Sequence, residues 1–168
     1  MAKNTDTITL GLGDLSVDGV DVGYLGGEVV FTTDIEAKDF RVGVPQHTVK
    51  RVITGFETSI KASLAQIDAS TVGLALGIGS ASTPNGKARI SFGTSWQLAE
   101  LNNVQFLHTR PNGKTVKIFF PKAQVRPGSQ ELRFSTDDYI LQDVTITALY
   151  DSRTAASSYP LGYIEFES

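Results

Sequence analysis

The sequence contains no cysteine, and histidine is scarce: its 168 residues include only His47 and His108. The absence of cysteine excludes disulfide frameworks, thiolate zinc sites and thiol nucleophiles together. His47 follows a loop proline and His108 lies near a hairpin tip, and a lone histidine in such a place is more often a surface residue than a catalytic base or metal ligand, so each is expected at the surface. Asp137 and Asp138 are adjacent carboxylates, which face opposite sides of an extended chain. The sequence therefore predicts no catalytic residue, no metal and no cofactor.

A strong charge of one sign and a long apolar run are also lacking. Charged residues make up 20% of the chain and the formal net charge is -3, which leaves no cationic field to grip DNA or an acidic membrane surface. No apolar run approaches the roughly 18 residues of a membrane span, and the first residues lack the apolar core of a signal peptide. We therefore expect no membrane partner. We also expect the protein to be made in a cytoplasm, which it leaves only by lysis or as part of a particle.

A long alternating stretch within residues 49–79 organises the chain. From Phe56 to Leu64, apolar or small side chains occupy every second position, which is the pattern of a strand with one buried face. The expected buried face carries Phe56, Thr58, Ile60, Ala62 and Leu64, and the opposite face carries Glu57, Ser59, Lys61 and Ser63. That polar face either meets bulk water in a monomer or lines the lumen of an assembly.

A short helix is expected directly after this strand, at about residues 68–77. Asp68 can accept hydrogen bonds from the free amides of the first turn, and Gly77 is typical of a helix C-terminal end. Gly73 inside the helix costs about 1 kcal/mol relative to alanine, so packing on a sheet must stabilise the helix. A helix of this length covers one end or edge of a sheet.

Two turn motifs predict hairpins. Asp18-Gly19 stands between short apolar segments and favours a type I′ turn. Pro111-Asn112-Gly113 separates two alternating segments, 104–108 and 116–120. Together with a last alternating strand around residues 144–148, these signals predict an all-β fold, a β-sandwich or partly open barrel with one short flanking helix.

Residues 34–48 lack a regular pattern and are expected to form a long loop. Fifteen residues is long for a connection in a compact domain, and four apolar side chains argue against simple disorder. The loop either folds back on its own domain or docks on another subunit. Its candidate contact residues are Ile35, Phe40, Val42 and Val44.

Both ends of the chain resemble extensions of the central domain, residues 14–150. Residues 1–13 are expected to form an N-terminal arm with Ile8 and Leu10 as apolar anchors. Residues 151–168 begin with a polar spacer and end in an aromatic segment that contains Tyr163, Ile164 and Phe166. This segment is either a tether with a docking tail or an edge strand that returns to its own sheet.

Three stretches together resemble the tail tube (major tail) proteins of long-tailed bacteriophages and related phage-like particles. The first is GDLSVDGVDVGY at residues 13–24, followed by GGEVVF at 26–31. The second runs from Pro45 through KRVITGFE at 50–57 to LAQI at 64–67, and the third is LALG at 74–77, where the helix closes. The resemblance covers roughly the first half of the chain, and the second half matches in strand order.

The resemblance implies a small β-sandwich that assembles with copies of itself into hexameric rings, stacked into a tube that conducts DNA into the host without binding it specifically. It also implies a place in the virion tail, assembly in the host cytoplasm, and tape measure and tube terminator proteins as partners. The arms and the long loop would contact other subunits and rings, and Glu57, Ser59, Lys61 and Ser63 would face the lumen.

Two other classes of function remain open at this stage. A β-sandwich that binds carbohydrate or a surface ligand would need an exposed aromatic platform, for which Trp96 and scattered tyrosines are the candidates. An enzyme on a β-barrel is disfavoured by the lack of catalytic motifs. Formation of rings or tubes would distinguish the structural subunit that we expect from a ligand-binding β-sandwich.

Overall fold

The computed structural model describes residues 13–66, 68–77, 84–91, 97–126, 142–153 and 159–167. Within these ranges the chain forms an eight-stranded antiparallel sheet and one short helix, which confirms the all-β class. The strands are β1 (Asp14–Val17), β2 (Val20–Asp21), β3 (Val30–Val42), β4 (His47–Leu64), β5 (Glu100–Thr109), β6 (Thr115–Val125), β7 (Gln142–Ala148) and β8 (Tyr163–Phe166). The helix is α1 (Ala69–Leu76), and a 3₁₀ turn covers Pro84–Gly86.

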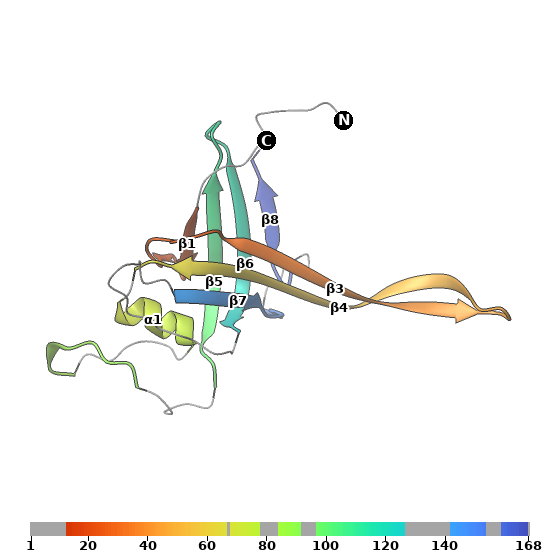
Figure 1. The fold of residues 1–168 in the computed structure, drawn as a ribbon, viewed down its shortest axis with the longest axis horizontal. Helices are drawn as coiled ribbons and strands as arrows, with labels where there is room; N and C mark the ends of the chain where they lie inside the picture. The colour runs from red at the N-terminus through yellow and green to blue at the C-terminus, as the bar shows by residue number, and fades with distance from the viewer. Residues whose placement is uncertain are drawn as a thin grey trace.

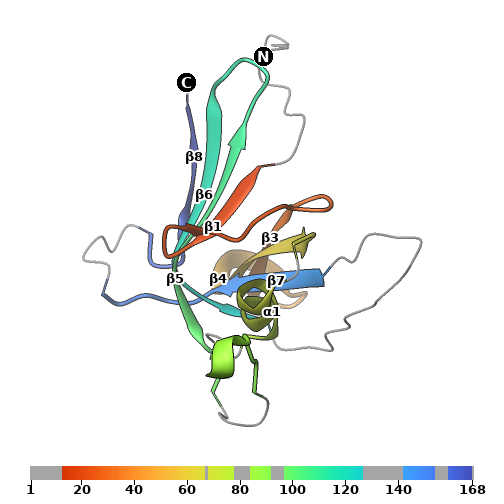
Figure 2. The ribbon, with the colours of Figure 1, turned by 90° about the vertical axis from the view of Figure 1, so that its left-hand side faces the viewer.

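The sheet is bent so that two groups of strands cross each other (Figure 1). The strands β3, β4 and β7 run across the view, while β5, β6 and β8 run upward, and Figure 2 shows the two groups from the side. The strand β6 joins the groups, because residues 116–119 pair with β8 and residues 123–125 pair with β7. This arrangement is the orthogonal packing of one sheet folded over itself.

The hydrophobic core is built from the faces that the two groups of strands turn toward each other. It includes Leu15, Ile60, Leu64, Val104, Phe120, Val125, Val144 and Ile146. The strand order is β2-β1-β5-β6-β7-β4-β3, with β8 added to β6, so the sheet is open and does not close into a barrel. The partly open alternative of the predicted fold class is therefore the one observed.

The helix α1 begins and ends where the sequence predicts. Asp68 has an extended backbone conformation and accepts hydrogen bonds from the amides of Ser70 and Thr71, both at 2.8 Å. Gly77 follows with a φ of 66°, the left-handed conformation that ends many helices. The helix packs against β7 and β6 through its buried residues Thr71, Gly73 and Ala75, so it covers one end of the sheet as expected (Figure 1).

Both predicted hairpins are present. Asp18 and Gly19 have φ values of 53° and 78° between β1 and β2, as a type I′ turn requires. The second hairpin joins β5 to β6 around Gly113. His108, expected at the surface, is instead buried on β5 because it falls on the same alternating face as the core residues Val104 and Phe106.

The long loop predicted at residues 34–48 is wrong. Asp34–Val42 continue β3, a tight turn covers residues 43–46, and β4 begins at His47. The apolar residues look irregular because both faces of β3 carry them: Ile35 lies on one face, Phe40 and Val42 on the other. Alternation on β4 is further shifted by two bulges opposite Glu36/Ala37 and Phe40/Arg41.

One further expectation, the burial of Phe56, needs correction, and the alternatives for the C-terminal segment are resolved. Phe56, expected in the core, is 50% exposed because β4 joins the rest of the sheet only from Ser59 onward, where its pairing with β7 begins. Of the two alternatives for the C-terminal segment, the edge strand is the one observed at residues 163–166, where β8 pairs with β6. The predicted anchors Ile8 and Leu10, and Trp96, lie outside the described residues.

Candidate assembly interface

The strands β3 and β4 extend well beyond the domain as a two-stranded ribbon (Figure 1). On β4 only residues 59–64 pair with β7, whereas residues 47–58 have β3 as their partner among the described strands. We call residues 34–58 the ribbon. An isolated two-stranded hairpin is at best marginally stable in water, because it has no second layer on which to bury its side chains. The ribbon is therefore the part of the fold that most needs a partner.

Apolar side chains are exposed on both faces of the ribbon. Residues that lie directly opposite each other on two paired strands point to the same face. The core-side face continues outward from the Phe31/Ile60 pair through Ile35/Phe56 to Ala37/Ile53. The opposite face carries Phe40 and Val42 near the end of β3. The exposed large apolar side chains of the ribbon are Ile35, Phe40, Val42, Val44, Val49, Ile53 and Phe56.

The backbone edges of the ribbon are open as well. The strand β3 is the last strand in the sheet order, so no described strand pairs with its outer edge. The outer edge of β4 is likewise unpaired by any described strand over residues 47–58. Exposed edges with free N–H and C=O groups favour pairing with another chain. Charged side chains limit this pairing, and Arg51 makes an ion pair with Asp39 at 2.7 Å across the ribbon.

The base of the ribbon forms one wall of an apolar groove with a volume of about 470 Å³. Phe31 and Phe56 line this wall, Phe120 lies beside them, and the C-terminal segment provides Leu161 and Ile164 on the other side. We call this cavity the base groove. Its volume lies within the range of roughly 300–1,000 Å³ that is usual for ligand pockets, so it can accommodate several side chains.

The C-terminal segment is held on the sheet by aromatic stacking. The ring of Tyr163 lies 5.3 Å from that of Phe119 and 5.0 Å from that of Tyr159, and the ammonium of Lys117 lies over both Phe119 and Tyr163. Ile164 and Phe166 remain exposed. Of the three predicted C-terminal contact residues, Tyr163 therefore contacts its own chain. Phe166 also contacts its own chain, because the guanidinium of Arg110 lies over its ring, but Phe166 and Ile164 keep exposed surface.

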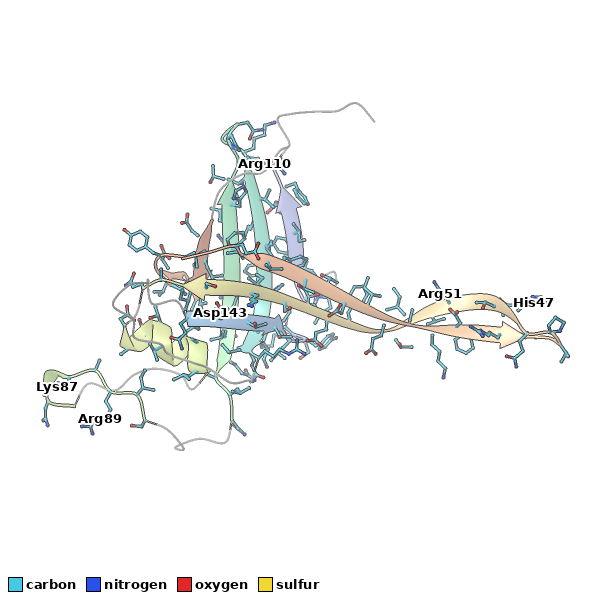
Figure 3. The ribbon with its side chains drawn as sticks, in the orientation of Figure 1. His47, Arg51, Lys87, Arg89, Arg110 and Asp143 are labelled. Atoms are coloured by element: carbon cyan, nitrogen blue, oxygen red, sulfur yellow. The ribbon has the colours of Figure 1, made fainter. Side chains whose placement is uncertain are left out.

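The four residues predicted to face a lumen lie together on the polar side of β4. Ser59, Lys61 and Ser63 are opposite Thr147, Thr145 and Asp143 of β7, on the face away from the buried Ile60. The ammonium of Lys61 lies 3.5 Å from the carboxylate of Asp143 (labelled in Figure 3), and Arg126 lies 3.2 Å from Glu57. The carboxylate of Asp34 on β3 also belongs to this face, because Asp34 lies directly opposite Glu57, so carboxylates outnumber the two paired cations.

The described residues contain no group of three or more histidines, cysteines, aspartates or glutamates that could hold a metal ion. His47 lies at the far end of the ribbon (Figure 3), whereas His108 is buried on β5, so the two imidazoles belong to separate parts of the fold. Among the described helices, none is long and apolar enough to cross a membrane. The prominent chemical features of the described fold are therefore its exposed apolar surface and open edges.

The candidate contact residues Ile35, Phe40, Val42 and Val44 are all exposed on the ribbon. Sequence reasoning did not name the exposed Val49, Ile53 and Phe56 on its other strand as contact candidates. The signal for a strand was present in Phe40, Val42 and Val44, which occupy every second position. The pairing of this strand with the start of β4 could not be inferred from the sequence. Two bulges at Thr54 and Val49 interrupt the alternation of side chains between the two faces of β4.

No protein-family model matches the chain, and a search of curated proteins gives no match. A solved structure does resemble it: the tube-terminating cap of the anti-feeding prophage aligns with 99% of this chain and 100% of its own, with a TM-score of 0.56 and 12% identity. The two chains share a fold. A chain from the virion of a native gene transfer agent particle aligns with 99% of this chain and 100% of its own, with a TM-score of 0.46 and 14% identity.

Proposed function

We propose that this chain is a structural subunit of a phage-tail-like particle, and that copies of it assemble into stacked rings around a lumen through which DNA passes. Its partners are further copies of itself and other tail proteins, such as a tape measure protein and a tube terminator. The rings are hexameric by analogy with the tail tube proteins that the first half of the sequence resembles. The protein performs no chemistry in this role.

The ribbon is the observation that carries this proposal. A monomer with this structure exposes seven large apolar side chains on a projection with two open edges. Soluble monomers rarely expose apolar surface on this scale, and larger exposed patches mark interaction sites. A contact between different surfaces of identical subunits generates a ring when its rotation closes, and a filament when it does not.

The polar face of β4 supports the assignment of a lumen. Glu57, Ser59, Lys61 and Ser63 are the proposed lining, and the cations among them and their neighbours are paired with carboxylates. Strong cationic contacts would hold the phosphates of passing DNA. A face on which Lys61 and Arg126 are paired and carboxylates are in excess lets the DNA slide.

The full-length likeness to a tube-terminating cap favours a second candidate within the same class. A cap is a ring that ends a tube, so it presents a stacking surface on one side only. The subunit contacts within the ring would be the same as in a tube. The two candidates differ in whether rings of this chain stack on each other.

Negative-stain electron microscopy of the purified protein, combined with analytical ultracentrifugation over a range of concentrations, tests the proposal. Tubes support the tube subunit, and single rings that do not lengthen support the cap. A monomer at every concentration would contradict both, and would favour the alternative of a ligand-binding β-sandwich.

A further inference from the structure

The far end of the ribbon carries a charge opposite to that of the rest of the protein. Residues 37–54, which we call the ribbon tip, contain Lys38, Arg41, Lys50 and Arg51 against the single acid Asp39, a formal charge of +3. Because the whole chain carries -3, the other residues carry -6. Figure 3 shows Arg51 and His47 on this distal part, away from the domain. The tip is therefore attracted to the body of any other copy of the chain.

The tip also carries apolar side chains that match the base groove in character. Val44 is 102% exposed at the turn, and Phe40 and Val42 precede it on the face opposite to the core. The base groove is lined mainly by aromatic and aliphatic side chains, with Phe31, Phe56 and Ile164 among them. Burying apolar side chains in such a groove contributes about 25 cal/mol for each Å² removed from water.

The tip cannot reach the base groove of its own chain. Thr33 lines the groove, and Val42 lies nine residues further along the same strand. At about 3.3 Å per residue, the strand itself holds Val42 and the turn that follows it about 30 Å away from the groove. An occupant that has the composition of the tip must therefore come from a second copy.

We infer that the base groove receives the ribbon tip of a neighbouring copy, with Val44 and its apolar neighbours seated between the base of the ribbon and β8. The contact joins two different surfaces, so each copy offers one tip and one groove, and the contact propagates. This inference rests on the proposal that copies of the chain assemble, and it specifies the surface through which they do so. The polar face of β4 stays uncovered in this arrangement.

Cysteine cross-linking tests the contact directly, because the natural chain has no cysteine. We would mix two single variants, Val44→Cys and Ile164→Cys, under mild oxidation and follow disulfide-linked dimers on non-reducing gels. The expected result is a mixed dimer that forms about tenfold faster than with the control pair, Val44→Cys and Val20→Cys. Val20 is also exposed but lies on β2, away from the groove. Thr58→Cys offers a second groove position if Ile164→Cys fails to fold.

The same experiment separates this inference from the proposed function. Tubes or rings without preferential cross-linking of the tip to the groove would overturn the inference and leave the proposed function standing. A specific mixed dimer from a chain that forms neither rings nor tubes would support the docking contact and contradict the tube. Preferential dimers of Val44→Cys with itself would show a symmetric tip-to-tip contact, and would also overturn the inference.

Charge reversal provides an independent readout. Lys38→Glu with Lys50→Glu should slow cross-linking about tenfold at about 0.01 M salt, and much less at about 0.15 M, where the Debye length has fallen from about 30 Å to about 8 Å. The cysteine variants that keep Lys38 and Lys50 should cross-link more slowly as the salt concentration rises. If the reversed variant cross-links as fast as the unchanged pair at low salt, the docking contact depends on its apolar side chains alone, and the attraction between the basic tip and the body of the neighbouring copy is overturned.

Discussion

Ile35 and Phe56 lie directly opposite each other on the ribbon, and they are 54% and 50% exposed. Phe31 and Ile60 form another pair on the same face, two pairs closer to the domain, and there Ile60 is fully buried. The face that forms the core thus continues out of the domain and remains apolar. The same register builds the core and the proposed contact surface. Because Ile35 and Phe56 lie outside the core, substituting them should affect the proposed assembly without unfolding the domain.

Shortening the ribbon should abolish assembly and leave the domain folded. Residues 37–54 would be replaced by Asn-Gly, which connects the paired residues Glu36 and Gly55 through a two-residue turn. None of the removed residues belongs to the buried core, so we expect a melting temperature close to that of the unmodified protein. Ultracentrifugation should find monomers. Normal tubes from the shortened protein would contradict the role of the ribbon.

The core side of β4 should be far more sensitive to substitution than its polar side. Leu64 is fully buried, so Leu64→Ala should cost about 2–5 kcal/mol and Leu64→Asp should prevent folding by burying an unpaired carboxylate. Lys61→Ala is the matched control: it removes an exposed ion pair with Asp143 and should cost less than about 1 kcal/mol. Urea unfolding measures all three. Near-native stability of Leu64→Asp would mean that the strand face is inverted.

Local patterns in the sequence were sufficient where a single strand, turn or helix end determined the outcome. The turn at Asp18-Gly19, the helix end residues Asp68 and Gly77, and the buried face from Ile60 to Leu64 all follow from backbone preference and alternation. Each of these features depends on residues close together in the chain. The same is true of the hairpin formed by β5 and β6.

The features that sequence reasoning missed depend on contacts between distant residues. The ribbon has apolar side chains on both faces, a pattern that does not distinguish an extended hairpin from an irregular loop. Phe119 on β6 is covered by Tyr163 of the same chain, and these two residues lie far apart in the sequence. The base groove could not be predicted, because β8 and the base of the ribbon are joined only by the three-dimensional fold.

Acid should weaken the cap of α1. The hydroxyl of Ser70 and the amide of Thr71 donate hydrogen bonds to Asp68 and lower its pKa from 3.8 to about 2. A lowered pKa means that the ionised form stabilises the fold; this contribution is complete above pH 3.8 and is lost as pH falls through about 2. Asp68→Ala should cost about 1 kcal/mol at neutral pH, and its deficit should shrink below about pH 4. Asp68→Asn, which still caps but does not ionise, should lose less stability and show a smaller pH dependence.

Gly162→Ala should detach β8 from the sheet. Gly162 has a φ of 134°, and a Cβ there would collide with the carbonyl oxygen of Phe119 and lie 2.8 Å from the ring of Phe120. We expect a loss of about 1–3 kcal/mol and faster hydrogen exchange of the β8 amides. Gly113→Ala is the control, because its φ of 80° is also positive but a Cβ there lies in open space. Equal effects of the two substitutions would mean that strain alone, and not the collision, is responsible.

Labelling of single cysteines should decide whether the polar face of β4 lines a lumen. Ser59→Cys places a thiol on this face, and Tyr24→Cys places one at an exposed position before β3, outside the ribbon and the base groove. In monomers, both thiols should react with a small maleimide and with a bulky polyethylene-glycol maleimide. In assembled tubes, the thiol at residue 59 should react with the small reagent only, because a narrow channel excludes the polymer. The thiol of Tyr24→Cys is the control that reports access from outside the tube. Equal reaction of residue 59 with the bulky reagent in tubes and in monomers would assign Glu57, Ser59, Lys61 and Ser63 to an outer surface, and the conduit for DNA would have to be lined by another face of the sheet.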